Sequence, residues 1–391
     1  MRTRLTHSFE VSTIGRALGE GAAKLVKSQY QQLHFSPRDI GTVVATACLL
    51  HDIGNPPFGH SGETAIGDWF NENVSNKGLK ISDDQELKDL TRFEGNAQAF
   101  RIATRLQWSG AEFGMNLTAA ALSTLIKYPC ASNESKGNAG AQSLKKFGYF
   151  KSDAYAFGEI RKLTGLVDHQ RHPLTYLMEA ADDIGYAAGD LEDVMKKGFV
   201  DYHTIREALH KVKAKESKEC VSKFLEKPYN EEFKNLDPRE RRQLSVQRFC
   251  QMAVRLMMKS AIEAFSKNFD LIMQQKLNKD LAGVMSMRDL CSELKDIMTQ
   301  HVYPHLEIAQ REQTARSVIA GLLEAVMGEV QERPKGPLAS FTYRGAPKHA
   351  SDCQVSENYQ IAFRAVDYVA GMTDGHALAH FHRIVGINAQ Y

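Results

Sequence analysis

Apolar residues recur at the spacing of an α-helix along most of this 391-residue chain. In residues 7–27 the repeat is formed by Phe9, Val11, Ile14, Leu18, Ala22 and Leu25. Steps of mostly three and four residues place such side chains on one helix face, whereas a half-buried strand needs strict alternation. The same pattern covers residues 93–107, 117–127, 173–197, 245–267 and 311–330. Because few stretches alternate, the sequence predicts an all-α fold of many helices.

The sequence Ser36-Pro37 predicts the start of a helix, because serine often caps a helix N-terminus and proline fits the first helical position. The helix that follows, to about His51, is apolar nearly all round and should be buried. Residues 332–354 hold several prolines and glycines, which predicts a surface loop. Within it, residues 338–343 are the one short stretch that could be extended.

The charge and cysteine content narrow the class of protein. Lys plus Arg number 49 and Asp plus Glu 47, a net charge of +2, so no strongly charged body implies an obligate nucleic-acid or membrane partner. The longest apolar stretch, residues 41–50, is far shorter than the roughly 20 residues that span a bilayer. The polar start lacks a signal-peptide core. Six cysteines without a CxxC pair fit reduced thiols, so we expect a cytoplasmic protein.

The buried helix predicted before residue 51 ends in an adjacent histidine and aspartate, His51 and Asp52. A charged aspartate is costly to bury unless it is paired or bound to a metal. Gly54, Asn55 and Pro56 then stop the helix, which leaves the pair at a helix end. On this pair alone, an aspartate that caps a helix end is the favoured interpretation. A metal site needs further ligands from other helices.

Two other places supply such ligands. His7 lies near the start of the first predicted helix. Asp182, Tyr186 and Asp190 follow one another at i, i+4 and i+8, so they share one helix face, among alanines and glycines that let another group approach closely. A tyrosine packed between two exposed acids is an equally good interpretation of this stripe in isolation.

His7, His51, Asp52 and Asp182 form a set of two imidazoles and two carboxylates. Such a set suits a divalent ion such as Mn²⁺, Fe²⁺, Co²⁺ or Zn²⁺. Four protein ligands on an ion that accepts six leave room for a water and a substrate oxygen, which is typical of a hydrolytic metal site.

Five strings of the chain resemble a known family in this order: RTRLTHSFEV, HDIGNPPFGHSGE, RFEGNAQAFR, HPLTYLMEAADDIGYAAGDLED and DYVAGMTDGHA. They are similar to the HD-domain deoxynucleoside triphosphate triphosphohydrolases of the dGTPase type, and they run from residue 2 to about 377. The resemblance implies a large HD-domain fold with inserted surface loops. It also implies a single helical phosphohydrolase domain over residues 1–391, with an HD core over about 1–200 and a C-terminal helical part over about 201–391.

The activity that the resemblance implies is hydrolysis of a dNTP to a deoxynucleoside and inorganic triphosphate, by water attack at the α-phosphorus. The implied metal ligands are His7, His51, Asp52 and Asp182, with the adjacent Asp183 as the alternative to Asp182. The implied ion is Mn²⁺ or Mg²⁺, with Fe²⁺, Co²⁺, Zn²⁺ and Ni²⁺ as alternatives. His60 matches the family's catalytic histidine, which protonates the leaving 5′ oxygen.

Further residues match by their place in the family strings. Glu63 matches the carboxylate partner of His60, and residues three apart in a helix face together. The residues implied to bind substrate are Arg4, Asn96, Lys127 and Lys146 at the phosphates, and Tyr186 and Asp190 at the deoxyribose.

The chain also departs from the family, whose members carry a further segment before the RTRLTHS string. That segment includes a glutamine that reaches the substrate sugar, whereas this chain has six residues before His7. This departure keeps open a nucleotide- or single-stranded nucleic-acid-binding protein with little turnover. Another HD-family nucleotide phosphohydrolase is a separate alternative. The resemblance also implies a homo-oligomer, often a hexamer.

Overall fold

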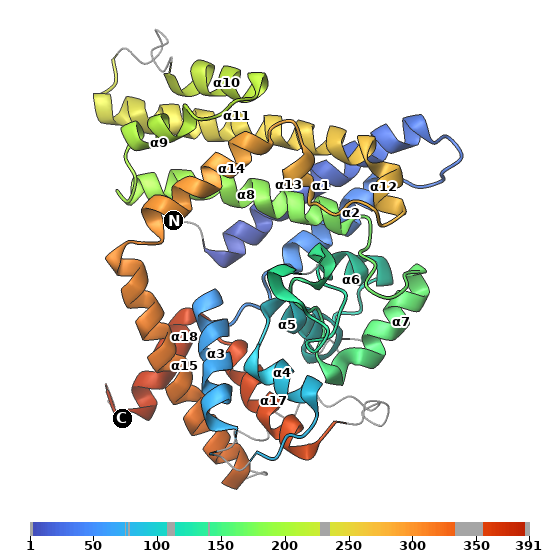
Figure 1. Cartoon of the computed structure of the whole chain (residues 1–391). Coiled ribbons are helices and arrows are strands. Elements are labelled where there is room, and N and C mark those ends of the chain that lie inside the picture. The colour runs from blue at the N-terminus through green and yellow to red at the C-terminus, as the bar shows by residue number, and fades with distance from the viewer. Residues whose placement is uncertain are drawn as a thin grey trace. The chain divides into compact units, whose positions relative to one another are not determined.

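The computed structural model describes residues 3–74, 76, 79–107, 114–139, 141–226, 235–332 and 355–387. Over these ranges the secondary structure is helical throughout and contains no strand, which confirms the all-α prediction (Figure 1). The expected surface loop at 332–354, with its extended piece at 338–343, lies outside the described residues apart from Glu332. No helix in the described part of the chain is long and apolar enough to cross a membrane.

The predicted helices form where the apolar repeats lie, and their bounds follow from local caps. The helix predicted from residue 93 begins only at Gly95, because the Glu94 side chain accepts a hydrogen bond from the Asn96 N–H and so caps it. The helix predicted from residue 245 begins earlier, at Pro238, with the Asp237 side chain as its cap. Two members of the first apolar repeat, Phe9 and Leu25, are exposed rather than buried.

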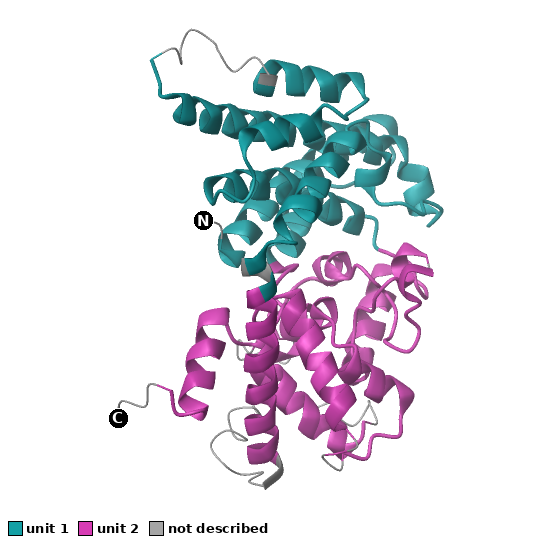
Figure 2. Ribbon diagram, turned by 60° about the vertical axis from the view of Figure 1, so that its left-hand side comes forward, with its two compact units in different colours: residues 1–49, 172–309 teal, residues 50–171, 310–391 magenta. Residues whose placement is uncertain are grey.

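The chain divides into two compact units, each made of two separate stretches of sequence (Figure 2). Unit 1 comprises residues 1–49 and 172–309, and unit 2 comprises residues 50–171 and 310–391. The two units therefore interleave along the chain. The single helical domain, with an HD core over about 1–200, stays a prediction.

Unit 1 is built around three helices that pack on one another, α1, α8 and α11, and α14 also packs on α8. Its helices are α1 (Arg4–Gln29), α2 (Pro37–Leu50, whose last residue falls in unit 2), α8 (Thr175–Lys196), α9 (Tyr202–Leu209), α10 (Lys215–Val221), α11 (Pro238–Lys267), α12 (Phe269–Met273), α13 (Leu281–Val284) and α14 (Arg288–Ile297).

Glycines let α1 approach its neighbours closely. A Cβ atom added at Gly19 of α1 would lie 2.8 Å from the Cα atom of Gly41 in α2, so the two backbones touch at a point where neither has a side chain. Seven residues earlier on α1, the Ser12 hydroxyl donates to the Ala45 carbonyl of α2 at 2.8 Å. On α8, a Cβ atom at Gly185 would lie 3.0 Å from Val11 Cγ2. These contacts place α1 against both α2 and α8.

Unit 2 has a hydrophobic core to which α3, α4, α5, α15 and α17 contribute. The largest fully buried side chains of this core include Phe70, Phe150, Tyr359 and Phe363. The helices of the unit are α3 (His60–Asn73), α4 (Asp84–Thr91), α5 (Gly95–Arg101), α6 (Ala119–Leu125), α7 (Ala154–Thr164), α15 (Leu306–Glu332, in unit 2 from residue 310), α17 (Glu357–Ala370) and α18 (Asp374–Ile384).

A buried ionic group joins α5 to α17 in unit 2. The Arg101 side chain, 5% exposed, donates to Asp367 from Nε at 2.8 Å and from Nη2 at 2.7 Å. Its Nη1 donates to both oxygens of Asp153 at 3.1 Å. Burial alone would lower the pKa of the guanidinium, but Asp367 and Asp153 raise it above its usual value, so it stays charged.

Removing one partner of this group should cost far more stability than removing an exposed ion pair. We expect Asp367→Ala to lower the free energy of unfolding by about 3–5 kcal/mol, because it leaves a buried guanidinium short of one of its two carboxylate partners. Asp84→Ala breaks the exposed Lys88–Asp84 pair and should cost about 0.5 kcal/mol or less. Urea unfolding of the two variants measures the difference, and equal losses would contradict this account of Arg101.

Candidate functional site

His7 and Asp182, two of the predicted metal ligands, face each other in unit 1. His7 lies in the first turn of α1, and Asp182 lies near the middle of α8. The His7 Nε2 atom is 3.5 Å from Asp182 Oδ1, and the two side chains are 17% and 27% exposed. The close approach of α1 to Gly185 explains this meeting, because Gly185 is on α8 only three residues after Asp182.

Asp183, the alternative ligand, has a different partner. Its Oδ1 accepts from Lys295 Nζ of α14 at 2.5 Å. Burial raises the pKa of Asp183 to about 6 although Lys295 opposes the shift. An acid engaged by a lysine is a poorer candidate for a metal than its neighbour, so this geometry supports the choice of Asp182.

The His51-Asp52 pair comes directly after the last residue of α2. His51 Nε2 lies 3.4 Å from Asp52 Oδ1, and the His51 side chain is 1% exposed. The Asn55 amide donates to Asp52 Oδ1 at 2.8 Å. A Cβ atom at Gly54 would lie 2.1 Å from both the Gly95 carbonyl oxygen and the Ala99 nitrogen. The turn after the pair therefore presses its backbone against α5, and Gly54 is required there because any side chain would collide.

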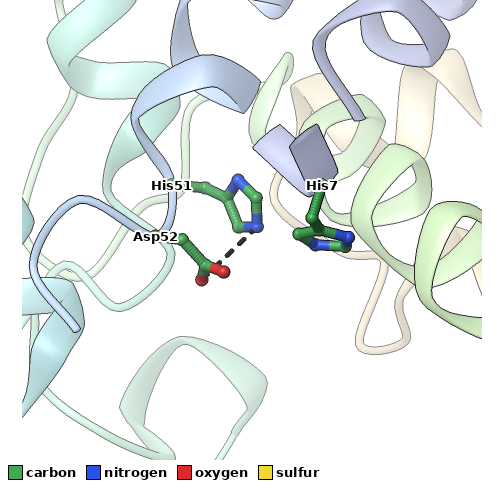
Figure 3. A group of neighbouring side chains, drawn as sticks. All are labelled: His7, His51 and Asp52. Carbon is green, nitrogen blue, oxygen red and sulfur yellow. Dashed lines mark ion pairs between the residues drawn. The ribbon is translucent and has the colours of Figure 1, made fainter. Parts of the chain in front are cut away.

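His7, His51 and Asp52 form the group of side chains in the described residues that could hold a metal ion (Figure 3). One ligand atom from each lies within 4.8 Å of the others. Two imidazole nitrogens and a carboxylate oxygen are a donor set that divalent transition metals accept. Asp182, which lies against His7, would complete the predicted set of four.

His60 and Glu63 form a second pair, in the first turn of α3. His60 Nδ1 lies 2.7 Å from Glu63 Oε2, while the imidazole is 83% exposed and Glu63 is 10% exposed. The other Glu63 oxygen accepts from the Gly95 N–H at 2.9 Å. The hydrogen bond to Glu63 raises the pKa of His60. Glu63 is thus fixed by α5 and in turn orients a solvent-facing imidazole whose Nε2 is directed away from it.

Two residues predicted to bind phosphates, Asn96 and Lys146, meet at Glu94, which the sequence analysis did not single out. Lys146 Nζ lies 2.9 Å from Glu94 Oε2, and the Asn96 amide donates to Glu94 Oε1 at 2.5 Å. Glu94 is buried, and its position two residues before Asn96, as the first residue of the string EGNAQ, is the signal that could have identified it.

The two acids near Lys146 titrate differently. Burial raises the pKa of Glu63, but the hydrogen bond to His60 and the charge of Lys146 outweigh it, so its pKa is lowered. Burial and the charge of Glu63 raise the pKa of Glu94 despite Lys146. The pKa of Lys146 is raised because Glu94 and Glu63 outweigh burial. Lys146 therefore remains a cation beside the His60–Glu63 pair.

The remaining predicted residues are placed by their elements. Arg4 begins α1, one helical turn before His7. Lys127 follows α6 on a segment that pairs with the Lys146 segment, since Gly148 N–H donates to the Cys130 carbonyl at 3.1 Å and Cys130 Sγ to the Lys146 carbonyl at 3.0 Å. For Arg4 and Lys127, the assignment continues to rest on position and resemblance.

On α8, the hydroxyl of Tyr186 contacts that of Tyr303, a residue that sequence reasoning missed. Tyr303 comes 117 residues later, so no local pattern could have paired the two rings. Asp190 lies one turn beyond Tyr186 on the same helix. The predicted sugar-binding ring is thus held by a second tyrosine.

Comparisons with known proteins identify the family of this chain. Residues 4–100 match the HD domain, and residues 284–383 match the phosphohydrolase-associated domain. A deoxyguanosinetriphosphate triphosphohydrolase-like protein of Listeria monocytogenes is 35% identical, over 99% of this chain and 87% of the relative. The chain belongs to the deoxyguanosinetriphosphate triphosphohydrolase-like family of HD-domain phosphohydrolases.

Other members of the dGTPase-like family match over similar lengths. A protein of Synechocystis with the same name is 31% identical over 99% of this chain and 87% of its own length. A probable deoxyguanosinetriphosphate triphosphohydrolase of Pseudomonas aeruginosa is 28% identical over 96% of this chain and 84% of its own length. The HD match includes His7, His51, Asp52 and His60, so this dGTPase-like chain is an HD-domain phosphohydrolase with a His/His/Asp group suited to a divalent metal.

The two adjacent aspartates of α8 should differ in their effect on metal binding. We expect Asp182→Asn to weaken Mn²⁺ binding at least about 10-fold, because it removes a predicted metal ligand. Asp183→Asn should retain Mn²⁺ affinity, because this acid pairs with Lys295, and should instead lower the unfolding temperature. Isothermal titration with Mn²⁺ and thermal unfolding of both variants measure the two effects. Weaker Mn²⁺ binding by Asp183→Asn alone would reverse the assignment.

Proposed function

We propose that this protein hydrolyses deoxynucleoside triphosphates to a deoxynucleoside and inorganic triphosphate. The observation that carries the proposal is the exposed His60 imidazole, held at 2.7 Å by Glu63 and flanked by the cation of Lys146. Such a pair suits protonation of a leaving oxygen. Full-length similarity to proteins named for dGTP triphosphohydrolysis supports the same reaction.

His7, His51, Asp52 and Asp182 would hold the metal, with Mn²⁺ or Mg²⁺ as the proposed ion. The mixed imidazole and carboxylate donors fit a divalent cation of this kind. A bound ion would supply positive charge to an α-phosphate oxygen and lower the pKa of a water molecule.

His60 has the role of general acid. Cleavage between the 5′ oxygen and the α-phosphorus leaves an alkoxide, which is a poor leaving group unless it receives a proton. The imidazole binds Glu63 through Nδ1, so Nε2 is the atom that gives the proton to the 5′ oxygen. Glu63 stabilises the protonated ring and fixes its orientation, because its second oxygen is held by the backbone of α5.

Lys146 and Asn96 are proposed to bind the triphosphate, with Lys127 and Arg4 as further cations. A triphosphate is strongly anionic, and charge-assisted hydrogen bonds from lysine and arginine are the contacts that such a group requires. Glu94 holds both Lys146 and Asn96. It therefore orders these two donors before substrate arrives, which reduces the entropy lost on binding.

Tyr186 and Asp190 are proposed to recognise the deoxyribose. A tyrosine ring against C2′ would exclude a 2′-hydroxyl by steric contact, and Asp190 would accept from the 3′-hydroxyl. The contact with Tyr303 limits the movement of the Tyr186 ring. The homo-oligomer, the cytoplasmic location and the binding of single-stranded nucleic acid stay predictions.

Product analysis tests the reaction. We expect the purified protein with Mn²⁺ to convert at least one dNTP to a deoxynucleoside and intact triphosphate, resolved by ion-exchange chromatography. His60→Ala should lower kcat by about 100-fold or more, because the proton donor is lost. Diphosphate, monophosphate or free phosphate as the product would indicate another HD phosphohydrolase. No product with Mn²⁺ bound would favour a binding protein.

The pH dependence of the reaction tests the role of Glu63. A general acid is active when protonated, so the raised pKa of His60 should keep the enzyme active to higher pH. Glu63→Gln weakens the hydrogen bond that raises this pKa and removes the charge of its acceptor, so the alkaline limb of kcat against pH should move to lower pH. The charges of Lys146 and Glu94, which also act on His60, remain in this variant.

Glu72→Gln is the matched control, since Glu72 lies on the same helix with an exposed side chain. It should leave the pH profile in place. An unchanged alkaline limb in Glu63→Gln would show that His60 does not set it.

A further inference from the structure

The turn directly before His60, the first residue of α3, has two residues with positive φ angles. Phe58 has φ 66° and Gly59 has φ 63°, both in the left-handed region. Glycine adopts this region readily, but a phenylalanine there is strained and keeps this conformation only when its surroundings fix it. His60 is the next residue, so the direction of its side chain depends on this turn.

The turn folds back on the helix that it begins. The Gly59 N–H donates to the Pro56 carbonyl at 3.0 Å. A Cβ atom at Gly62, in the first turn of α3, would lie 2.0 Å from the Pro57 carbonyl oxygen. These local contacts set the course of residues 56–59, but none of them engages the Phe58 N–H.

That N–H is bound by a residue from the other end of unit 2. The Phe58 N–H donates to Asp374 Oδ1 at 2.9 Å, across 316 residues of sequence. Asp374 is the first residue of α18, whose N-terminus is capped separately by Thr373, the side chain of which accepts from the His376 N–H. Asp374 belongs to the string DYVAGMTDGHA, to which the proposed mechanism gives no role.

We infer that Asp374 is a positioning residue for His60: its carboxylate accepts the Phe58 N–H, holds the left-handed Phe58–Gly59 turn, and so fixes the general acid. This inference rests on the proposed function. Asp374 lies within the phosphohydrolase-associated match and Phe58 within the HD match. The bond therefore gives the associated segment an indirect part in the catalysis of the HD domain, through the position of His60. Glu63 fixes the ring of His60, and Asp374 fixes its backbone.

Three variants of the full chain separate this role from a merely structural one. Asp374→Ala removes the acceptor, Asp374→Asn keeps an oxygen that can accept the Phe58 N–H, and Thr373→Ala removes the cap of α18 without touching Phe58. We expect Asp374→Ala to lower kcat for triphosphate release at least about 10-fold with KM changed less than about 3-fold, because a misplaced catalytic group slows the chemical step. Asp374→Asn should restore kcat to within about 3-fold of the wild type.

Thr373→Ala should lower the unfolding temperature and leave kcat within about 2-fold of the wild type. A kcat loss in Thr373→Ala equal to that in Asp374→Ala would overturn the inference, because the stability of α18 would then explain both. Unchanged kcat in Asp374→Ala would also overturn it.

Two measurements do not depend on activity, so they distinguish failure of this inference from failure of the proposed function. Hydrogen exchange should show the Phe58 amide protected in the wild type and in Asp374→Asn but not in Asp374→Ala. The NMR titration of His60, which Glu63, Glu94 and Lys146 also influence, should move to lower pH in Asp374→Ala alone, because the Glu63 hydrogen bond loosens. An unprotected Phe58 amide in the wild type overturns the inference even if Asp374→Ala fails to fold.

Discussion

The close approach of α1 to α2 and α8 is the constraint on which the proposed metal centre depends. Helices meet at this distance only where side chains are absent, and Gly19, Gly41 and Gly185 supply that absence. The approach to α8 brings His7 to Asp182, and α2 ends directly before His51. Within unit 1, His7 and Asp182 are therefore brought together by backbone packing although 174 residues separate them in the sequence, before any ion contributes.

The electrostatics of the His60 region follow from a different arrangement, in which two carboxylates share one lysine. Glu63 binds His60 and keeps a lowered pKa, while the more deeply enclosed Glu94 holds Lys146 and has a raised one. Glu63 and Glu94 raise the pKa of His60, whereas the charge of Lys146 lowers it. A phosphate that drew Lys146 away from Glu94 would therefore change the pKa of the imidazole, so in the proposed reaction substrate binding would be electrostatically linked to proton donation.

The sequence alone predicted the helical class, most long helices and the pairs that lie a few residues apart, because helical spacing determines which neighbours face together. His60 and Glu63 are such a pair. Glu94 was missed although the string EGNAQ carried a local signal for it, because its ion pair with Lys146 spans 52 residues. Tyr303 and Asp374 were missed because their partners lie over a hundred residues away. The positive φ of Phe58 could not be predicted either, since a phenylalanine does not favour it. Phe9 and Leu25 fit the helical repeat yet are exposed, so periodicity identified the helix better than its buried face.

The interleaving of the two units has a consequence for how the protein is made. The chain passes from one unit to the other at residues 49–50, 171–172 and 309–310. The core of unit 2 combines α3, α4 and α5 with α15 and α17, so its early helices have no complete partner surface until residues 310–370 have left the ribosome. Contacts between such distant segments also slow folding, because a long loop must close before they form. During synthesis, therefore, the apolar faces of α3, α4 and α5 stay exposed until α15 and α17 have been made. Chaperones that act on nascent chains can bind these faces in that interval.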